Sequence, residues 1–197
     1  MTGSGATRKI VLLRGINIGA NNRIAMPALR ELLTGAGLGD VRTYVQSGNV
    51  VLTSDAEPDA LGQQCEDLIA DAFGLAIPVV VRTRDELADV VRRDPLGAIA
   101  ESPKRYQVSF LSGTPDPAIV RKLEALTIGD ERFTAIGREF YTWHSEGVAR
   151  SKLWAAIADR RLGVTATARN WTTVTTLLAM ADEEAQAPVS RAARPSR

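Results

Sequence analysis

The order in which strand-like and helix-like patterns follow one another constrains the fold of this chain more than any other feature. In the first half, four short runs rich in apolar and β-branched residues alternate with two stretches whose apolar residues repeat at helical spacing. In chain order, these segments span residues 9–14, 26–36, 41–46, 49–53, 59–73 and 77–82. Ser47 and Gly48 predict a two-residue hairpin turn between the second and third strands. The predicted order is β-α-β-β-α-β.

The second half repeats this order, after a helix at residues 84–93 that begins with a capping-box spacing at Thr83 and Glu86. Its segments span residues 105–111, 117–126, 131–136, 139–144, 151–162 and 171–184. The predicted order is β-α-β-β-α-α, which ends in a helix where the first half ends in a strand. The split β-α-β arrangement predicts an α+β protein made of two ferredoxin-like units with antiparallel sheets that can pack together.

The expected domain organisation follows from these patterns. A first ferredoxin-like unit at residues 8–93 and a second at residues 105–184 are joined by a Pro- and Gly-containing linker at residues 94–104. Residues 1–7 and 185–197 are rich in small and polar residues without apolar periodicity, so both ends are expected to be flexible.

The composition excludes several classes of protein. The net charge is +1, from 24 basic and 23 acidic residues, so bulk electrostatics give no argument for a polyanionic partner. The single cysteine, Cys65, excludes an internal disulfide and a multi-cysteine metal site. No apolar run approaches the roughly 18 residues needed to span a membrane, and the polar N-terminus has no signal-peptide core. We expect a cytoplasmic protein without a metal, a cofactor or a membrane partner.

The loop that follows the first strand is the main candidate for a binding site. It is rich in Gly, Asn and Arg, and Arg14 offers a planar set of donors suited to a phosphate or carboxylate. Right-handed crossovers bring this loop to the same sheet edge as the hairpin between the second and third strands. The expected ligand-binding residues are Arg14, Gly15, Asn17, Gly19, Asn22, Arg23, Gln46, Ser47 and Asn49.

These residues also have a purely structural interpretation. Asn and Gly are common turn residues, and an Arg at the end of a strand often pairs with a neighbouring carbonyl or carboxylate group. The glycine spacing matches neither the P-loop nor the dinucleotide-binding fingerprint. Two hypotheses therefore stay open for this edge: a site for a small anionic ligand of phosphate or nucleotide type, and turn chemistry alone.

A second basic cluster is a further candidate for an anion site. It consists of Arg150, Ser151, Lys152, Arg169 and Asn170. Ser151 and Asn170 are natural helix N-caps, so the basic side chains could converge on an anion at two helix N-termini. The structural alternative, which we favour, is that Arg169 bridges the two halves and Trp171 belongs to the core.

No catalytic constellation is evident, so the catalytic residues are unknown and enzymatic activity is left open. His144 is the only histidine and could act as an acid or base near neutral pH, but a hydrogen-bonded or solvated role is more common at a strand end. Cys65 lies on the apolar face of its predicted helix, which favours a buried side chain over a nucleophile.

Aromatic residues on two strands of the second half suggest an alternative function. Tyr106, Phe110, Tyr141 and Trp143 occupy strands that stack bases in ferredoxin-like RNA-recognition modules. Their packing against the first sheet is favoured, because the first strand is apolar on both faces. The alternatives to ligand binding are a nucleic-acid-binding module that uses these aromatics and an interaction or dimerisation module. The protein could be a monomer or a homodimer.

Four short segments of the sequence resemble those of a known family. They are Leu12–Gly19, Val41–Val51, Ser151–Leu153 and Ala168–Trp171. On these segments the chain is identified as a member of the mostly bacterial domain-of-unknown-function family 1697, over roughly residues 8–182. The resemblance implies an α+β fold of ferredoxin-like character and carries over no activity. Residues 20–23 depart from the family, in which a Gly- and Lys-containing run is usual.

Overall fold

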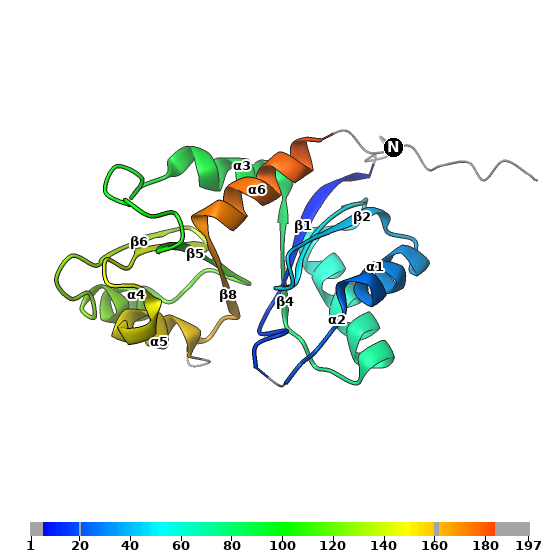
Figure 1. Ribbon diagram of the computed structural model, residues 1–197, viewed down its shortest axis with the longest axis horizontal. Helices are drawn as coiled ribbons and strands as arrows, with labels where there is room; N and C mark the ends of the chain where they lie inside the picture. Colours follow the sequence, from blue (N-terminus) through cyan, green and yellow to red (C-terminus); the bar gives the residue numbers. More distant parts are fainter. Residues whose placement is uncertain (1–5, 20, 160–161, 184–197) are drawn as a thin grey trace, which may run out of the picture.

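Two four-stranded antiparallel sheets form the framework of the protein (Figure 1). The structure is a computed structural model that describes residues 6–19, 21–159 and 162–183. Residues 1–5 and 184–197, which include most of the ends expected to be flexible, lie outside the described residues.

The first unit has the expected order β-α-β-β-α-β, followed by a helix. Its elements are β1 (Thr7–Leu13), α1 (Met26–Gly35), β2 (Gly39–Tyr44), β3 (Asn49–Ser54), α2 (Pro58–Phe73), β4 (Val79–Thr83) and α3 (Arg84–Arg93). The strands lie in the order β2-β3-β1-β4, and β1 pairs antiparallel with both β3 and β4. This is the strand order of a ferredoxin-like unit, as the sequence predicted.

The second unit repeats the whole of this order, which corrects the predicted β-α-β-β-α-α. Its elements are β5 (Tyr106–Leu111), α4 (Pro117–Glu124), β6 (Arg132–Ile136), β7 (Glu139–Trp143), the short 3-10 helix η1 (Val148–Arg150), α5 (Lys152–Ala158), β8 (Ala166–Asn170) and α6 (Trp171–Asp182). The unexpected strand, β8, pairs with β5 at the sheet edge, in the order β6-β7-β5-β8. Its sequence, Ala-Thr-Ala-Arg-Asn, lacks the large apolar residues that predict a strand.

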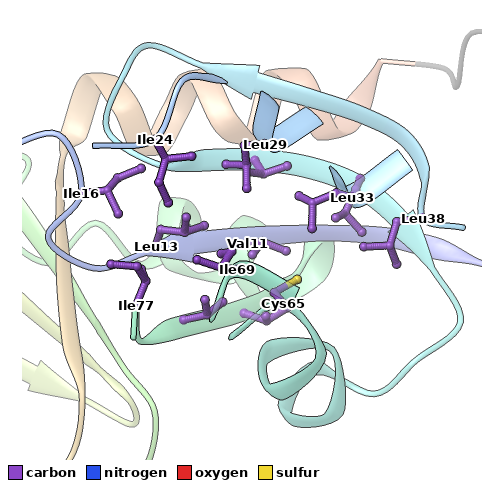
Figure 2. Packing of buried hydrophobic residues seen from close by; sticks show 14 of the residues in the cluster. Val11, Leu13, Ile16, Ile24, Leu29, Leu33, Leu38, Cys65, Ile69 and Ile77 are labelled. Atoms are coloured by element: carbon purple, nitrogen blue, oxygen red, sulfur yellow. The ribbon is translucent and has the colours of Figure 1, made fainter. Parts of the chain in front are cut away.

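Each unit packs one face of its sheet against its own two long crossover helices. In the first unit, side chains of β1 such as Val11 and Leu13 meet Leu29 and Leu33 of α1 and Cys65 of α2 (Figure 2). In the second unit, Leu111 and Phe140 pack against side chains of α4 and α5. The alternation of side chains along β1 therefore sends Val11 and Leu13 to this core and the intervening residues to the opposite face.

A central core joins the two units. It contains Ile10 and Leu12 from β1, residues of α3 and α6, and the inner face of the second sheet. Figure 1 shows α3 and α6 lying side by side where the two sheets meet. The four aromatics expected to pack here are at most 6% exposed: Tyr106, Phe110, Tyr141 and Trp143. The packing interpretation of these residues is confirmed.

The hairpin between β2 and β3 differs from its prediction. Tyr44 pairs with Asn49, so the loop has four residues, 45–48, in place of the two-residue turn predicted at Ser47 and Gly48. Val45 and Gly48 both have a positive φ, of 49° and 71°. A Cβ atom at Gly48 would lie 2.6 Å from the Leu13 Cβ atom, so glycine allows the hairpin to approach the end of β1.

The expected helix caps are present. Thr83 and Glu86 form both hydrogen bonds of a capping box at the start of α3. The Ser151 side chain accepts a hydrogen bond from the Trp154 backbone N–H, and the Asn170 side chain accepts one from the Thr173 backbone N–H. These caps satisfy backbone N–H groups at the first turns of α5 and α6.

Candidate functional site

The loop after β1 and the β2–β3 hairpin are neighbours, as the crossover argument predicted. The Asn17 side-chain amide donates a hydrogen bond to the Gln46 carbonyl oxygen, with a donor–acceptor distance of 2.8 Å. The Leu13 backbone N–H donates to the Gly48 carbonyl oxygen at 2.9 Å. These bonds hold the two segments together at one end of the first sheet.

Three of the expected ligand-binding side chains support the loop itself. The Asn17 amide also exchanges hydrogen bonds with the backbone of Ile24. The Asn22 side chain donates to the Gly15 carbonyl oxygen, and Arg23 donates to that of Gly19. The turn interpretation therefore accounts for the side chains of Asn17, Asn22 and Arg23.

Two adjoining hollows lie where this loop meets the second unit. Their volumes are about 190 and 300 Å³. They share five lining residues: Gly15, Ile18, Trp154, Ala168 and Arg169. We call the two hollows together the Arg169 cleft. Of the expected site residues, Arg14 lines the first hollow, and Asn17, Ser47, Asn49 and Asn170 line the second, whereas Gly19, Asn22, Arg23 and Gln46 line neither.

Arg169 bridges the two units, as the structural interpretation expected. Its side chain comes from the edge strand β8 of the second unit and is 8% exposed. It donates hydrogen bonds to the Asn49 side-chain oxygen and, at 2.8 Å, to the Leu13 carbonyl oxygen. Further bonds reach the Ser47 carbonyl oxygen and, within β8, the Thr167 hydroxyl. All of these acceptors are uncharged.

Burial of Arg169 has an electrostatic consequence. Removal of the guanidinium from water lowers its pKa to about 10, which leaves it charged at neutral pH. Among the described residues, no carboxylate is a partner of this group. The positive charge of Arg169 therefore has no opposite charge beside it in the described part of the chain, and the wall of the cleft is positively charged. A buried charge of this kind is unfavourable unless an opposite charge compensates it.

The first unit contains an equivalent arginine. Arg82 is the fourth residue of β4, as Arg169 is of β8, and each strand leads directly into the last helix of its unit. Arg82 donates at 2.8 Å to the carbonyl oxygen of Leu111, the last residue of β5, and Arg169 donates at 2.8 Å to that of Leu13, the last residue of β1. The two arginines thus reach across to the other unit in the same way.

The two arginines differ in the partner of their Nε atom. Arg82 donates from Nε to the carboxylate of Glu139, the first residue of β7, at 2.9 Å. Arg169 donates from Nε to the carboxamide of Asn49, the first residue of β3. At equivalent positions, one buried guanidinium has an ionic partner and the other has a neutral one. The compensated arginine, Arg82, lines none of the hollows described above.

The residues of the second basic cluster do not meet at one site. Arg169 and Asn170 belong to the Arg169 cleft, whereas Arg150, Ser151 and Lys152 line a separate hollow together with the acidic residues Glu131 and Glu146. The separation arises because β8 carries Arg169 and Asn170 back to the sheet edge after α5 has ended. The mixed charges of the separate hollow give no net preference for an anion.

His144 is fully buried and hydrogen-bonded, in agreement with the expected structural role. Its Nδ1 atom lies 3.0 Å from a carboxylate oxygen of Glu131, and its ring packs edge-on against Trp154. Burial opposes ionisation of Glu131, but hydrogen bonds with Ser151 and His144 outweigh it and lower the pKa of this carboxyl group. The ionised Glu131 thereby anchors the segment that leads into α5.

Sequence reasoning missed several residues of the cleft, and Trp154 and Ser109 are two of them. Trp154 lines both hollows from α5, and Ser109 lines the first hollow from β5. Trp154 stands three residues after the N-cap Ser151, so its position was predictable once the helix start was known. Ser109 carries no local signal, because its place in the cleft depends on the pairing of β5 with the unexpected strand β8.

Comparisons with known proteins agree with this fold. A solved structure of a conserved bacterial protein from Streptococcus pneumoniae superimposes with a TM-score of 0.73 and 23% sequence identity, and covers 90% of this chain and 99% of that protein. A search of curated proteins found no match. Within the described residues, no helix is long and apolar enough to cross a membrane.

The family profile described as "Protein of unknown function (DUF1697)" matches residues 6–141, which is more than half of the chain. The match includes the loop after β1 and the β2–β3 hairpin. It confirms the resemblance found in the sequence. The chain belongs to the DUF1697 family.

Proposed function

We propose that this protein binds a small anionic ligand in the Arg169 cleft. The observation that carries the proposal is the buried guanidinium of Arg169, which has only neutral hydrogen-bond acceptors while its equivalent, Arg82, has the carboxylate of Glu139. A ligand anion would supply the missing negative charge. The driving force is therefore the compensation of a charge that the fold already holds out of water.

The composition of the cleft supports this proposal. Among the described residues that line the two hollows, Arg14 and Arg169 are basic and none is acidic. Arg14 is half-buried and donates one hydrogen bond to the carbonyl oxygen of Ala158, the last residue of α5. A second guanidinium at the entrance adds attraction for an anion and further donors for its oxygen atoms.

The proposed ligand site extends beyond the loop and the hairpin at which the sequence analysis expected it. Loop and hairpin supply one wall, through Gly15, Ile18 and Ser47, and the second unit supplies the other, through Trp154 and Arg169. Sites between two units are common places for small ligands, because rigid elements on both sides hold the walls apart. Burial of the aromatics of the second sheet opposes the alternative function, in which those residues would stack nucleic-acid bases.

Thermal-shift measurements with inorganic phosphate, acetate and nucleoside monophosphates test the proposal. We expect at least one anion to raise the thermal midpoint, because a ligand that binds only the native state stabilises it by mass action. Arg14→Ala should weaken this effect about tenfold in apparent affinity, given the usual strength of a charge-assisted hydrogen bond. The matched control is Arg92→Ala, on the exposed surface of α3. Stabilisation that is equal in both variants, or absent with every anion, contradicts the proposal.

A further inference from the structure

The first hollow of the Arg169 cleft is mainly apolar, although two basic residues, Arg14 and Arg169, belong to its lining. Its apolar lining includes Ile18, Trp154, Ile157 and Ala166. A simple inorganic anion would leave these side chains against water. A ligand that fills the hollow therefore needs an apolar part next to its charge.

Ile18 gives an independent indication of this apolar part. It lies at the tip of the loop after β1 and is 73% exposed, the largest value among the exposed large hydrophobic residues of the described chain. It nevertheless lines both hollows. A ligand bound in the cleft would cover part of this exposed aliphatic side chain and gain the free energy of its burial.

Trp154 indicates the shape of the apolar part. It is half-buried, lines both hollows and packs edge-on against the buried ring of His144, with a centroid distance of 5.8 Å and an angle of 90° between the rings. This contact fixes the orientation of the indole beside the cleft. A fixed indole offers a flat surface, against which another aromatic ring packs more favourably than an aliphatic chain of equal area.

The size of the hollow agrees with a single ring. Its volume of about 190 Å³ is comparable to the roughly 150 Å³ of an apolar cavity that holds benzene. Ser109 lies in its lining, and among the described residues the buried hydroxyl of Ser109 has no hydrogen-bond partner.

We infer that the ligand is a small aromatic anion, whose ring packs beside Trp154 in the first hollow while its anionic group faces Arg169. The inference rests on the proposed function and specifies its ligand. Carboxylates and phosphates share the chemistry that Arg169 requires, so the anionic group can be either of them. The ring is the feature that separates this inference from binding of any anion.

Four probes test the inference: acetate, benzoate, inorganic phosphate and phenyl phosphate. Calorimetric titration of the wild-type protein should give at least about tenfold tighter binding for the member of each pair that carries the ring, from the apolar area the ring buries. The pair that binds more tightly identifies the anionic group. Equal affinities within both pairs would overturn the inference and leave the proposed function standing. Absence of binding by all four would contradict both.

Two variants connect the advantage of the ring to this hollow. Trp154→Ala should reduce the affinity for the ring-bearing probe about tenfold, and Trp154→Phe should retain most of it.

A spectroscopic measurement on the intact protein is independent of these variants. The three tryptophans give three indole N–H signals, and Trp154→Phe assigns one of them. Benzoate or phenyl phosphate should shift the Trp154 signal and leave those of Trp143 and Trp171 in place. A probe that binds without shifting the Trp154 signal places the ring elsewhere and overturns the inference.

Discussion

Arg82 and Arg169 occupy equivalent positions in the two units, and only Arg82 meets a carboxylate. Arg82 is paired with Glu139, and Arg169 is paired with the carboxamide of Asn49. Both side chains reach the end of the first strand of the other unit through a carbonyl oxygen. The protein thus has two buried guanidinium groups at equivalent positions, of which one is compensated by a carboxylate and the other is not. The cleft lies at the uncompensated one.

Replacement of Arg169 by Met should destabilise the protein. The substitution removes the bonds to Asn49 and Leu13. The Asn49 side-chain oxygen loses its Arg169 donor, and the Leu13 carbonyl oxygen keeps the longer bond from the Thr167 hydroxyl, at 3.4 Å. We expect a loss of about 3 kcal/mol in the free energy of unfolding, measured by urea denaturation. Arg92→Met, at a side chain that is 75% exposed, should change it by less than about 0.5 kcal/mol. Similar values for the two variants would show that Arg169 does not hold the units together.

Replacement of Gly48 by Ala should disturb the hairpin that borders the cleft. The new Cβ atom would lie 2.6 Å from the Leu13 Cβ atom, at a residue whose φ is 71°. The control is Gly74→Ala, where φ is 67° and no atom lies within 4 Å of the new Cβ atom. We expect a loss of about 1 kcal/mol for the control and about 3 kcal/mol for Gly48→Ala, by chemical denaturation. Equal losses would mean that the approach of the hairpin to β1 is not close-packed.

The Glu131 carboxylate should make stability depend on pH in the acidic range. Its pKa is lowered below the ordinary value of 4.5, so the stabilisation is present above pH 4.5 and is lost as the pH falls through the lowered pKa. Glu131→Gln should therefore lower the free energy of unfolding most near neutral pH. The free energies of unfolding of the two proteins should converge as the pH falls through the lowered pKa of Glu131. If the difference in free energy of unfolding between the two proteins stays constant over this pH range, the ionised Glu131 does not stabilise the fold.

The thiol of Cys65 should be unreactive in the native protein. Burial, followed by the negative charge of the neighbouring Glu66, raises its pKa to about 12. Thiolate is the reactive form, so a disulfide reagent at about pH 8 should modify the native protein only as fast as it unfolds. The same reagent should detect one thiol at once in guanidinium chloride. Rapid modification of the native protein would show that this side of α2 opens.

Local signals in the sequence were sufficient to predict most helices and strands and the position of the loop after β1. The caps at Thr83, Ser151 and Asn170 depend on side chains that bond to their own helix, so short sequence words predict them. The adjacency of the loop to the hairpin followed from the handedness of the crossovers, which is a general property of the chain.

Features that depend on contacts between distant segments could not be predicted. Strand β8 has almost no local signal, because its small residues gain their strand conformation from pairing with β5. The bond between Arg169 and Asn49 joins residues 120 positions apart, and it exists only because the two units dock. For the same reason, the sequence suggested that Arg169 bridges the two halves but did not indicate that it reaches Asn49 or that Trp154 lies beside it.

The Asn49→Asp variant shows most directly whether the uncompensated charge of Arg169 attracts the ligand. It places a carboxylate beside Arg169, as Glu139 stands beside Arg82, and keeps nearly the same side-chain shape. The account predicts a folded protein that anions no longer stabilise in a thermal-shift titration, because the new carboxylate already compensates the guanidinium and repels a second anion. If an anion stabilises this variant as strongly as the wild-type protein, Arg169 is not the group that attracts the ligand, and the account is wrong.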